Sequence, residues 1–204
     1  MQNKGAILII SGPSGCGKST LLKEVYNNID NYYFSISTTT RSPRDGERNG
    51  VDYYFVTKEE FEKDIEDGNF LEYAKVHDNY YGTSLKPIIE SLNNGKLVIF
   101  DIDVQGHKIV RKKLHALITS VFITTPSLQV LKDRLYSRNS DDNDVIEKRL
   151  KNAQIEIDSF LEYDYLIIND DLEKSTKEML SIANIARRKT KIFDKETILN
   201  SWLA

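Results

Sequence analysis

One short segment, GPSGCGKS at residues 12–19, constrains the fold of this chain more than any other part of its sequence. With Thr20 after it, the segment matches the pattern G-x-x-x-x-G-K-[ST], in which successive backbone N–H groups turn inward around a phosphate. The pattern requires a strand before it and a helix after it. Residues 6–10 are a short apolar run typical of a buried strand, and residues 19–27 have the apolar spacing of a helix. The predicted phosphate-binding residues are Gly12, Pro13, Ser14, Gly15, Cys16, Gly17, Lys18, Ser19 and Thr20.

The residue types in this loop indicate a nucleotide phosphate donor and a magnesium ion. Glycines allow a turn that would strain residues with a Cβ, and the start of the next helix directs its positive end at the anion. Lys18 can reach the β- and γ-phosphates, and the Ser19 hydroxyl can complete the Mg²⁺ coordination shell. The alternative is a glycine turn that carries Lys and Ser by chance. The strand and helix on either side of the loop disfavour that alternative.

The rest of the chain alternates between predicted strands and helices. Continuous apolar runs at residues 97–102, 120–124 and 165–168 are typical of strands covered on both faces, and helical patterns lie between them. This alternation predicts an α/β fold, a parallel sheet with helices on both faces. After residue 168 a last helix is expected from about residue 172 to residue 188, followed by a tail, TILNSWLA, that packs as a short amphipathic piece.

Residues 34–83 do not follow this alternation of strands and helices. Two turn signals, at residues 43–46 and 49–50, separate β-prone stretches, which favours an antiparallel insertion with one clear helix at residues 58–67. Arg41, Arg44 and Arg48 fall within eight residues of the insertion, among threonines and tyrosines. Taken alone, such a cluster is as typical of a solvated loop as of an anion site.

A polar link at residues 139–143 separates two further predicted helices, one after Pro126 and one from residue 144 to about residue 160. Arg134 and Arg138 are four residues apart and share one helix face, while Arg149 lies beside the apolar stripe of the following helix. Three arginines can therefore converge across the link. The alternative is that they are surface cations paired with nearby acidic residues.

Composition excludes several classes of function. A net charge of -3 gives no global field for a nucleic acid, and no apolar stretch is long enough to span a membrane. Cys16 is the single cysteine, which excludes a disulfide framework or a multi-cysteine zinc site and fits a cytoplasmic location. The histidines His77, His107 and His115 show no metal spacing and are expected at the surface.

Over nearly its whole length, from about residue 6 to about residue 186, the chain resembles guanylate kinases. The resemblance is carried by the glycine loop followed, in the family's order, by SISTTTRSPRDGERNGVDYYF, FLEYAKVHDNYYGTS, LVIFDIDVQG and NDDL. It implies a P-loop NTPase-type core at residues 1–33, 84–134 and 151–204. It also implies a small mixed α/β insertion at 34–83 that binds the nucleoside monophosphate, and a helical lid at 135–150.

The resemblance implies ATP-dependent phosphorylation of GMP, and of dGMP as well, to the diphosphate. The GMP-binding residues it implies are Ser37, Arg41, Arg44, Glu47, Tyr53, Glu72, Tyr81, Thr83 and Asp101. Forked guanidiniums and phenol donors suit a phosphate dianion. Guanine presents adjacent N1–H and N2–H donors that the Glu72 carboxylate can accept together, whereas adenine would oppose it with an acceptor.

The resemblance further implies that Arg134, Arg138 and Arg149 are lid arginines that act with Lys18 in catalysis, and that Asn169 lies near the adenine. Mg²⁺ is the implied cofactor, held by Ser19 and, through water, by Asp101. Because a phosphate oxygen of GMP is already anionic, no general base is expected. The family usually has Gly-Thr where this chain has Asn139-Ser140, which is expected to stiffen the lid tip.

Two alternatives stay open at this point. One is a P-loop kinase for another small phosphorylated acceptor, against which Ser37, Glu72 and Thr83 argue. The other is a guanylate-kinase-like interaction module without catalysis, against which the intact phosphate loop and lid arginines argue. The expected partners are the small molecules GMP and ATP, with neither nucleic acid nor membrane, and the sequence does not decide between a monomer and a homodimer.

Overall fold

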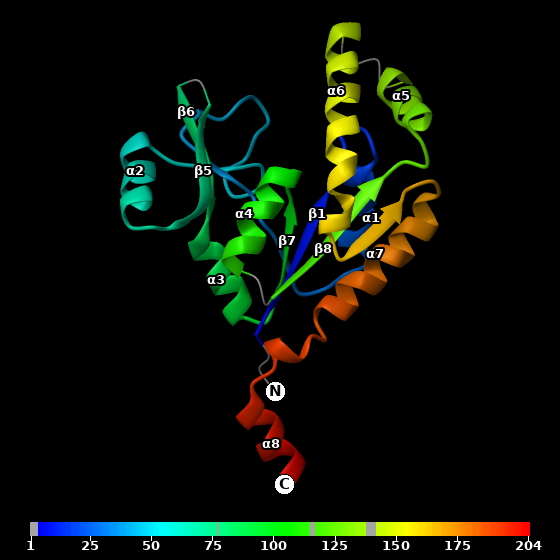
Figure 1. The fold of residues 1–204 in the computed structure, drawn as a ribbon. Coiled ribbons are helices and arrows are strands. Elements are labelled where there is room, and N and C mark those ends of the chain that lie inside the picture. Colours follow the sequence, from blue (N-terminus) through cyan, green and yellow to red (C-terminus); the bar gives the residue numbers. More distant parts are fainter. Residues whose placement is uncertain (1–3, 77, 115–116, 138–141) are drawn as a thin grey trace.

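The computed structural model describes residues 4–76, 78–114, 117–137 and 142–204. At its centre is a parallel β-sheet with the strand order β2-β7-β1-β8-β9 (Figure 1). Its strands are β1 (Ala6–Ser11), β2 (Tyr32–Phe34), β7 (Leu97–Asp101), β8 (Ile118–Thr124) and β9 (Tyr165–Ile168). Ile10 of β1 pairs with Asp101 on one side and with Val121 on the other. The loop after β1 therefore starts at the middle of the carboxyl edge of the sheet.

Helices cover both faces of this sheet. On one face lie α1 (Lys18–Asn27) and α7 (Leu172–Ala186), and on the other lie α3 (Leu85–Asn93) and α4 (Val104–Leu114). Alternate residues of β1 divide between these layers, since Leu8 and Ile10 join the first apolar cluster and Ile7 and Ile9 join the second. Burial on both faces explains the continuous apolar run of β1. The predicted α/β class, a parallel sheet with helices on both faces, is confirmed.

A smaller mixed sheet follows β2, with the strand order β4-β3-β6-β5. Its elements are β3 (Thr38–Thr39), β4 (Tyr54–Phe55), α2 (Lys58–Glu66), β5 (Phe70–Val76) and β6 (Asn79–Ser84). The prediction of an antiparallel insertion is wrong for β3 and β4, which pair in parallel, while β6 is antiparallel to both β3 and β5. The turn signals in residues 40–53 belong to a long loop that returns the chain to the starting end of β3, so they do not close a hairpin.

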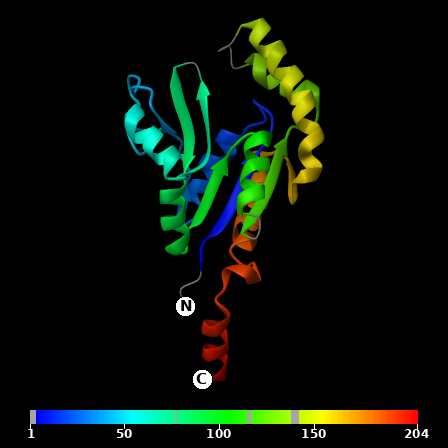
Figure 2. The same cartoon turned by 60° about the vertical axis from the view of Figure 1, so that its left-hand side comes forward.

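Two more helices rise from the other side of the central sheet. They are α5 (Leu128–Ser137) and α6 (Asn143–Glu156), the second followed by the 3₁₀ helix η1 (Ile157–Glu162). Both views show the smaller sheet with α2 on one side of the carboxyl edge and α5 with α6 on the other (Figures 1 and 2). Arg138 and the Asn139-Ser140 pair lie outside the described residues. The carboxyl edge of the central sheet is thus flanked by two separate structural units.

Two expectations about burial are wrong. The strand at residues 165–168 is not covered on both faces, because β9 is the edge of the sheet and leaves Leu166 and Ile168 exposed. The tail after η2 (Thr190–Ile192) forms α8 (Lys195–Leu203), which extends away from the body instead of packing on it (Figures 1 and 2). Trp202 on α8 is 81% exposed.

The expectation that His107 lies at the surface is also wrong. It is buried in α4, and its ring stacks on Tyr163 with ring centroids 3.9 Å apart. Burial, helped by the cation of Arg111, lowers the pKa of His107 from 6.5 to about 4, while Glu162 and Asp164 oppose the shift. His107 is therefore a neutral core residue at pH 7.

We expect this histidine to make folding stability depend on pH. The unfolded chain takes up a proton on His107 below pH 6.5, whereas the folded chain does so only near pH 4, so stability falls as the pH drops through this window. His107→Phe keeps the ring contact and removes the titration, so its loss of unfolding free energy between pH 7 and pH 4.5 should be smaller by about 2.4 kcal/mol. Urea unfolding at both pH values measures the difference. Equal losses in the two proteins would contradict the assignment.

Candidate functional site

The phosphate loop between β1 and α1 is built around glycines that no other residue can replace. Gly12 has φ 150° and Gly17 has φ 93°, both in the region that favours glycine. A Cβ on Gly12 would lie 2.0 Å from the backbone oxygen of Ile123, and one on Gly17 would lie 2.4 Å from Nδ2 of Asn169. The backbone of β8 and the Asn169 side chain after β9 therefore pack directly against the loop and leave no space for a Cβ at these two positions.

Lys18 lies at the start of α1 and lines a cavity of about 360 Å³. Its Nζ donates to the backbone oxygen of Gly12 over 2.5 Å, which turns the side chain back over the loop. Residues from the loop, from the end of β7 and from the end of α6 line this cavity: Gly12, Ser14, Gly15, Gly17, Lys18, Ser19, Asp101, Ile102, Asp103 and Glu156. The cavity thus brings the predicted residues Lys18, Ser19 and Asp101 together.

Asp101 is held at the carboxyl end of β7 beside the phosphate loop. Burial raises the pKa of its carboxyl group, and the positive charge of Lys18 acts in the opposite direction. A hydroxyl from Ser19 and a carboxylate from Asp101 are the hard oxygen donors that suit Mg²⁺. In the part of the chain that the structure describes, no group of three or more His, Cys, Asp or Glu side chains could hold a metal by itself. A metal here would therefore take further ligands from a substrate and water.

A second cavity, of about 270 Å³, opens on the other side of the loop. It is lined by Gly15, Gly17, Thr20, Arg134, Ser137, Asn169, Asp170 and Leu172. Asn169 follows β9, and its Nδ2 donates to the backbone oxygen of Cys16 over 2.9 Å. Arg134 donates from Nη2 to the backbone oxygen of Asn169 (2.9 Å) and from Nη1 to that of Cys16 (3.3 Å). These bonds tie α5 and the end of β9 to the phosphate loop.

Cys16, the residue that both side chains contact through its backbone, is itself a packing residue. Its side chain is fully buried, and burial raises the pKa of the thiol, although Lys18 acts in the opposite direction. A raised pKa keeps the sulfur protonated and unreactive at neutral pH.

Arg149 approaches the same loop from α6. Its Nη1 lies 3.4 Å from the Ser14 hydroxyl, and α6 is anchored beneath it by the buried side chains of Ile146, Leu150 and Ala153. Two of the predicted lid arginines, Arg134 and Arg149, therefore lie beside the loop. Arg138, the third, lies outside the described residues.

In the insertion, a cluster forms around the Arg41 guanidinium. Its Nη2 donates to both carboxylate oxygens of Glu47 over 2.9 Å, and its Cζ lies 5.4 Å from the centroid of the Tyr53 ring. The hydrogen bond that Arg41 donates to Glu47 raises the pKa of Arg41, and the interaction with Tyr81 raises it further. The rings of Tyr53 and Tyr81 are 6.2 Å apart. The structure thus brings Arg41, Glu47, Tyr53 and Tyr81 together.

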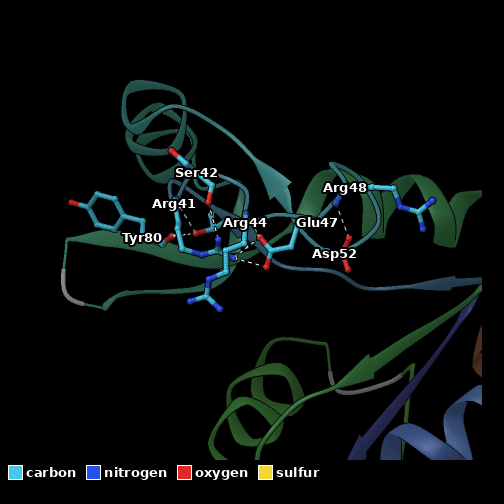
Figure 3. A network of polar contacts seen from close by, with 8 residues as sticks. Arg41, Ser42, Arg44, Glu47, Arg48, Asp52 and Tyr80 are labelled. Carbon is cyan, nitrogen blue, oxygen red and sulfur yellow. Dashed lines mark hydrogen bonds and ion pairs between the residues drawn. The ribbon is translucent and has the colours of Figure 1, made fainter.

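The other two arginines of the insertion are placed differently. Arg44 contributes its backbone N–H to the Glu47 carboxylate over 2.8 Å, and its exposed side chain points out of this network (Figure 3). Arg41 and then Arg44 lower the pKa of Glu47. The Arg48 side chain points away from the cluster, and its backbone N–H donates to Asp52 (Figure 3). Arg44 is therefore available to a ligand at this cluster, while Arg48 belongs to a surface turn.

Glu72 and Thr83 face each other across β5 and β6. They are register partners, and the Thr83 hydroxyl donates to Glu72 Oε1 over 2.5 Å. The register of the pair shifts between Phe70 and Glu72, as a β-bulge does, which re-aims side chains at that point. Ser37 lies next to β3, and its backbone oxygen accepts a hydrogen bond from Tyr54. The bulge and the threonine fix the orientation of the Glu72 carboxylate.

Neither Glu156 nor Asp103 was predicted to line the phosphate cavity. Oδ1 of Asp103 accepts a hydrogen bond from the Gly106 backbone N–H at the start of α4. It also lines the cavity beside Lys18, as does Glu156. The available signal for Glu156 was its position seven residues, or two helical turns, after Arg149.

Within the described ranges, no helix is both long enough and apolar enough to cross a membrane.

Comparisons with known proteins assign the chain to one family. The family model of guanylate kinase matches residues 4–185. A guanylate kinase of Sulfurimonas denitrificans is 54% identical over 97% of this chain and 96% of the relative, and one of Campylobacter jejuni is 52% identical over 99% and 98%. Among solved structures, a guanylate kinase from Anaplasma phagocytophilum superposes with a TM-score of 0.71 at 32% identity, covering 98% of this chain and 95% of the other.

Proposed function

The chain belongs to the guanylate kinase family, and from this premise we propose how it transfers the γ-phosphoryl group of ATP to GMP. The observation that carries the proposal is the pairing of two anion sites. One is the phosphate loop with Lys18, and the other is the cluster of Arg41, Tyr53 and Tyr81 on the insertion. The first lies at the middle of the carboxyl edge of the central sheet and the second on the insertion beside that edge (Figure 1), which suits a donor and an acceptor that must meet in line.

ATP is assigned to the phosphate loop and its two cavities. The triphosphate lies along the loop backbone and Lys18, in the larger cavity that Ser19 and Asp101 also line. The adenine lies in the smaller cavity, beside Asn169 and Leu172. The resident cofactor in this proposal is Mg²⁺, held by Ser19 and, through water, by Asp101. When bound, it would neutralise charge on the phosphates.

GMP is assigned to the insertion. Its phosphate takes the N–H groups of Arg41 that are not donated to Glu47 or to the Ser42 backbone oxygen, with Arg44, Tyr53 and Tyr81 as further donors. Its base meets the carboxylate of Glu72, which the Thr83 hydroxyl holds in place by donating its one hydrogen, and the Ser37 hydroxyl serves O6. A carboxylate selects guanine because guanine alone presents two adjacent donors there.

The protein acts mainly by positioning and charge. A GMP phosphate oxygen is anionic at neutral pH and attacks without a general base. Lys18 at the γ-phosphate, with Arg134, Arg138 and Arg149 from the lid, stabilises charge on the transferring group. Closure of the insertion and the lid excludes water, which would otherwise hydrolyse ATP.

We propose the same division of the chain as the resemblance implies. The core comprises residues 1–33, 84–134 and 151–204, the GMP-binding insertion 34–83, and the lid 135–150. The substrates GMP and ATP are the proposed partners. A cytoplasmic location is proposed as well, which the free, buried thiol of Cys16 supports.

We expect Arg134→Ala to lower kcat by about 10²-fold and to leave the Kd of GMP nearly unchanged, because Arg134 contacts the phosphate loop and not the insertion. Lys132→Ala removes an exposed cation from the same helix and is the matched control. Steady-state rates and GMP titrations on the three proteins measure both quantities. A near-normal kcat in Arg134→Ala would reject its role.

The assignment of substrates is tested by release of ADP from Mg·ATP with GMP, dGMP, AMP, CMP, UMP or dTMP as acceptor. Rapid release with GMP and dGMP, and at least about 100-fold slower release with the other acceptors, is expected. If ADP release were fastest with a different nucleotide, that nucleotide would be the substrate in place of GMP.

A further inference from the structure

Glu156 is a charged residue of the phosphate cavity that the mechanism above leaves unused. It is the last residue of α6, it is partly buried, and it lines the same cavity as Lys18, Ser19 and Asp101. Asp103 is the remaining carboxylate of that lining.

The helix geometry aims Glu156 at the phosphate loop. Glu156 follows Arg149 by seven residues, so the two side chains lie two turns apart on nearly the same face of α6. Arg149 reaches Ser14 of the loop. The neighbouring face of the helix is fixed in the core by Ile146, Leu150 and Ala153. One lid helix therefore presents a cation and a carboxylate to the same substrate.

The charges of the cavity are unbalanced. Among its described lining residues, Lys18 is the cation, and Asp101, Asp103 and Glu156 are carboxylates. Burial raises the pKa of Glu156, Asp103 raises it further, and Lys18 opposes the rise. With all four groups ionised, negative charges outnumber positive ones in the lining, and they still do when Arg149, which contacts Ser14 of that lining, is counted. Such a cavity disfavours a bare triphosphate and favours one that brings a divalent cation.

We propose that Glu156 is a positioning residue that makes triphosphate binding depend on Mg²⁺. Its carboxylate faces the metal-bound triphosphate and accepts hydrogen bonds from the hydration shell of the metal. Without the metal, the same carboxylate repels the triphosphate. This inference rests on the assignment of ATP to the phosphate loop. It gives α6 a second residue that acts on ATP, Glu156 at its C-terminal end, in addition to Arg149.

The test is calorimetric titration of ATP, without GMP, into the wild-type protein and Glu156→Gln, in excess EDTA and across a series of Mg²⁺ concentrations. In EDTA, Glu156→Gln is expected to bind ATP about fivefold to tenfold more tightly than wild type, because one repelling charge is gone. Mg²⁺ should tighten ATP binding in both proteins. The Mg²⁺ concentration that gives half of this gain in affinity is expected to be about fivefold higher for Glu156→Gln than for wild type. Asp158→Asn, an exposed charge change two residues away, is the matched control and is expected to change neither quantity.

Tighter ATP binding in EDTA together with a higher Mg²⁺ requirement supports the inference, because a merely structural defect weakens ATP binding in both conditions. Unchanged affinities, or equal weakening with and without Mg²⁺, would overturn it. If Glu156→Gln does not fold, Glu156→Asp carries the test. It keeps the charge, so its affinity in EDTA should stay at the wild-type value, while its shorter carboxylate raises the Mg²⁺ requirement. GMP phosphorylation by the wild-type protein in the same buffer separates failure of this inference from failure of the proposed function.

Discussion

Lys18→Ala is expected to lower kcat by about 10³-fold, the largest loss that a single substitution in this chain should cause. The Lys18 ammonium is the cation that lines the phosphate cavity from the start of α1, and it is held over the loop by the backbone oxygen of Gly12. Alanine removes the charge at the point where negative charge develops during transfer. The Kd of GMP should change little, because Lys18 lies outside the insertion.

Lys23→Ala is the matched control, since Lys23 is an exposed cation on the same helix. ADP release at saturating GMP and Mg·ATP gives kcat for both variants, and thermal unfolding checks that each is folded. A folded Lys18→Ala protein that retained a tenth or more of wild-type kcat would contradict the assignment of the donor site.

The second large effect is expected in specificity. Glu72→Gln should reduce the ratio of kcat/KM for GMP to that for AMP by about 10²-fold. The glutamine amide offers one acceptor where the carboxylate offers two, so a donor of guanine loses its partner, while adenine no longer faces a negative charge. The Thr83 hydroxyl, 2.5 Å from Glu72 Oε1, holds the side chain in place, so the effect should be chemical and not a loss of order.

Glu59→Gln removes an exposed charge from α2 of the same insertion and should leave the ratio unchanged. The ratio comes from initial rates with each nucleotide over a range of concentrations. A Glu72→Gln protein with the wild-type ratio would remove this residue from recognition of the base.

Features that depend on local sequence could be predicted well. The phosphate loop is an example, because Gly12 and Gly17 must adopt positive φ and lie against neighbouring strands, which few sequences permit. The strands β1 and β7 could be predicted because burial on both faces makes their sequence continuously apolar.

Features set by distant parts of the chain could not be predicted. The run Tyr165–Ile168 is as apolar as a central strand, yet its place at the sheet edge depends on which strands pair. His107 is polar by composition but is buried because Tyr163, far along the chain, stacks on it. The parallel pairing of β3 and β4 likewise depends on the path of the long loop between them.

The candidate site shows the same limit. Arg41, Glu47, Tyr53 and Tyr81 are named by the resemblance, but only the fold brings their side chains together and pairs Glu47 with Arg41. Glu156 carries no motif of its own, and its position at the phosphate cavity follows from how α6 packs. Spacing along a helix predicts which residues share a face, but it does not predict what that face meets.

In the proposed function, a donor site at the middle of the carboxyl edge of one sheet meets an acceptor site on the insertion beside that edge. The most direct test of this proposal is calorimetric titration with adenosine and guanosine joined through a pentaphosphate, which spans both sites at once. We expect one molecule to bind per chain, at least about 100-fold more tightly than GMP or ATP alone, because binding of the second half is intramolecular. An affinity no higher than that of ATP alone would contradict the proposal.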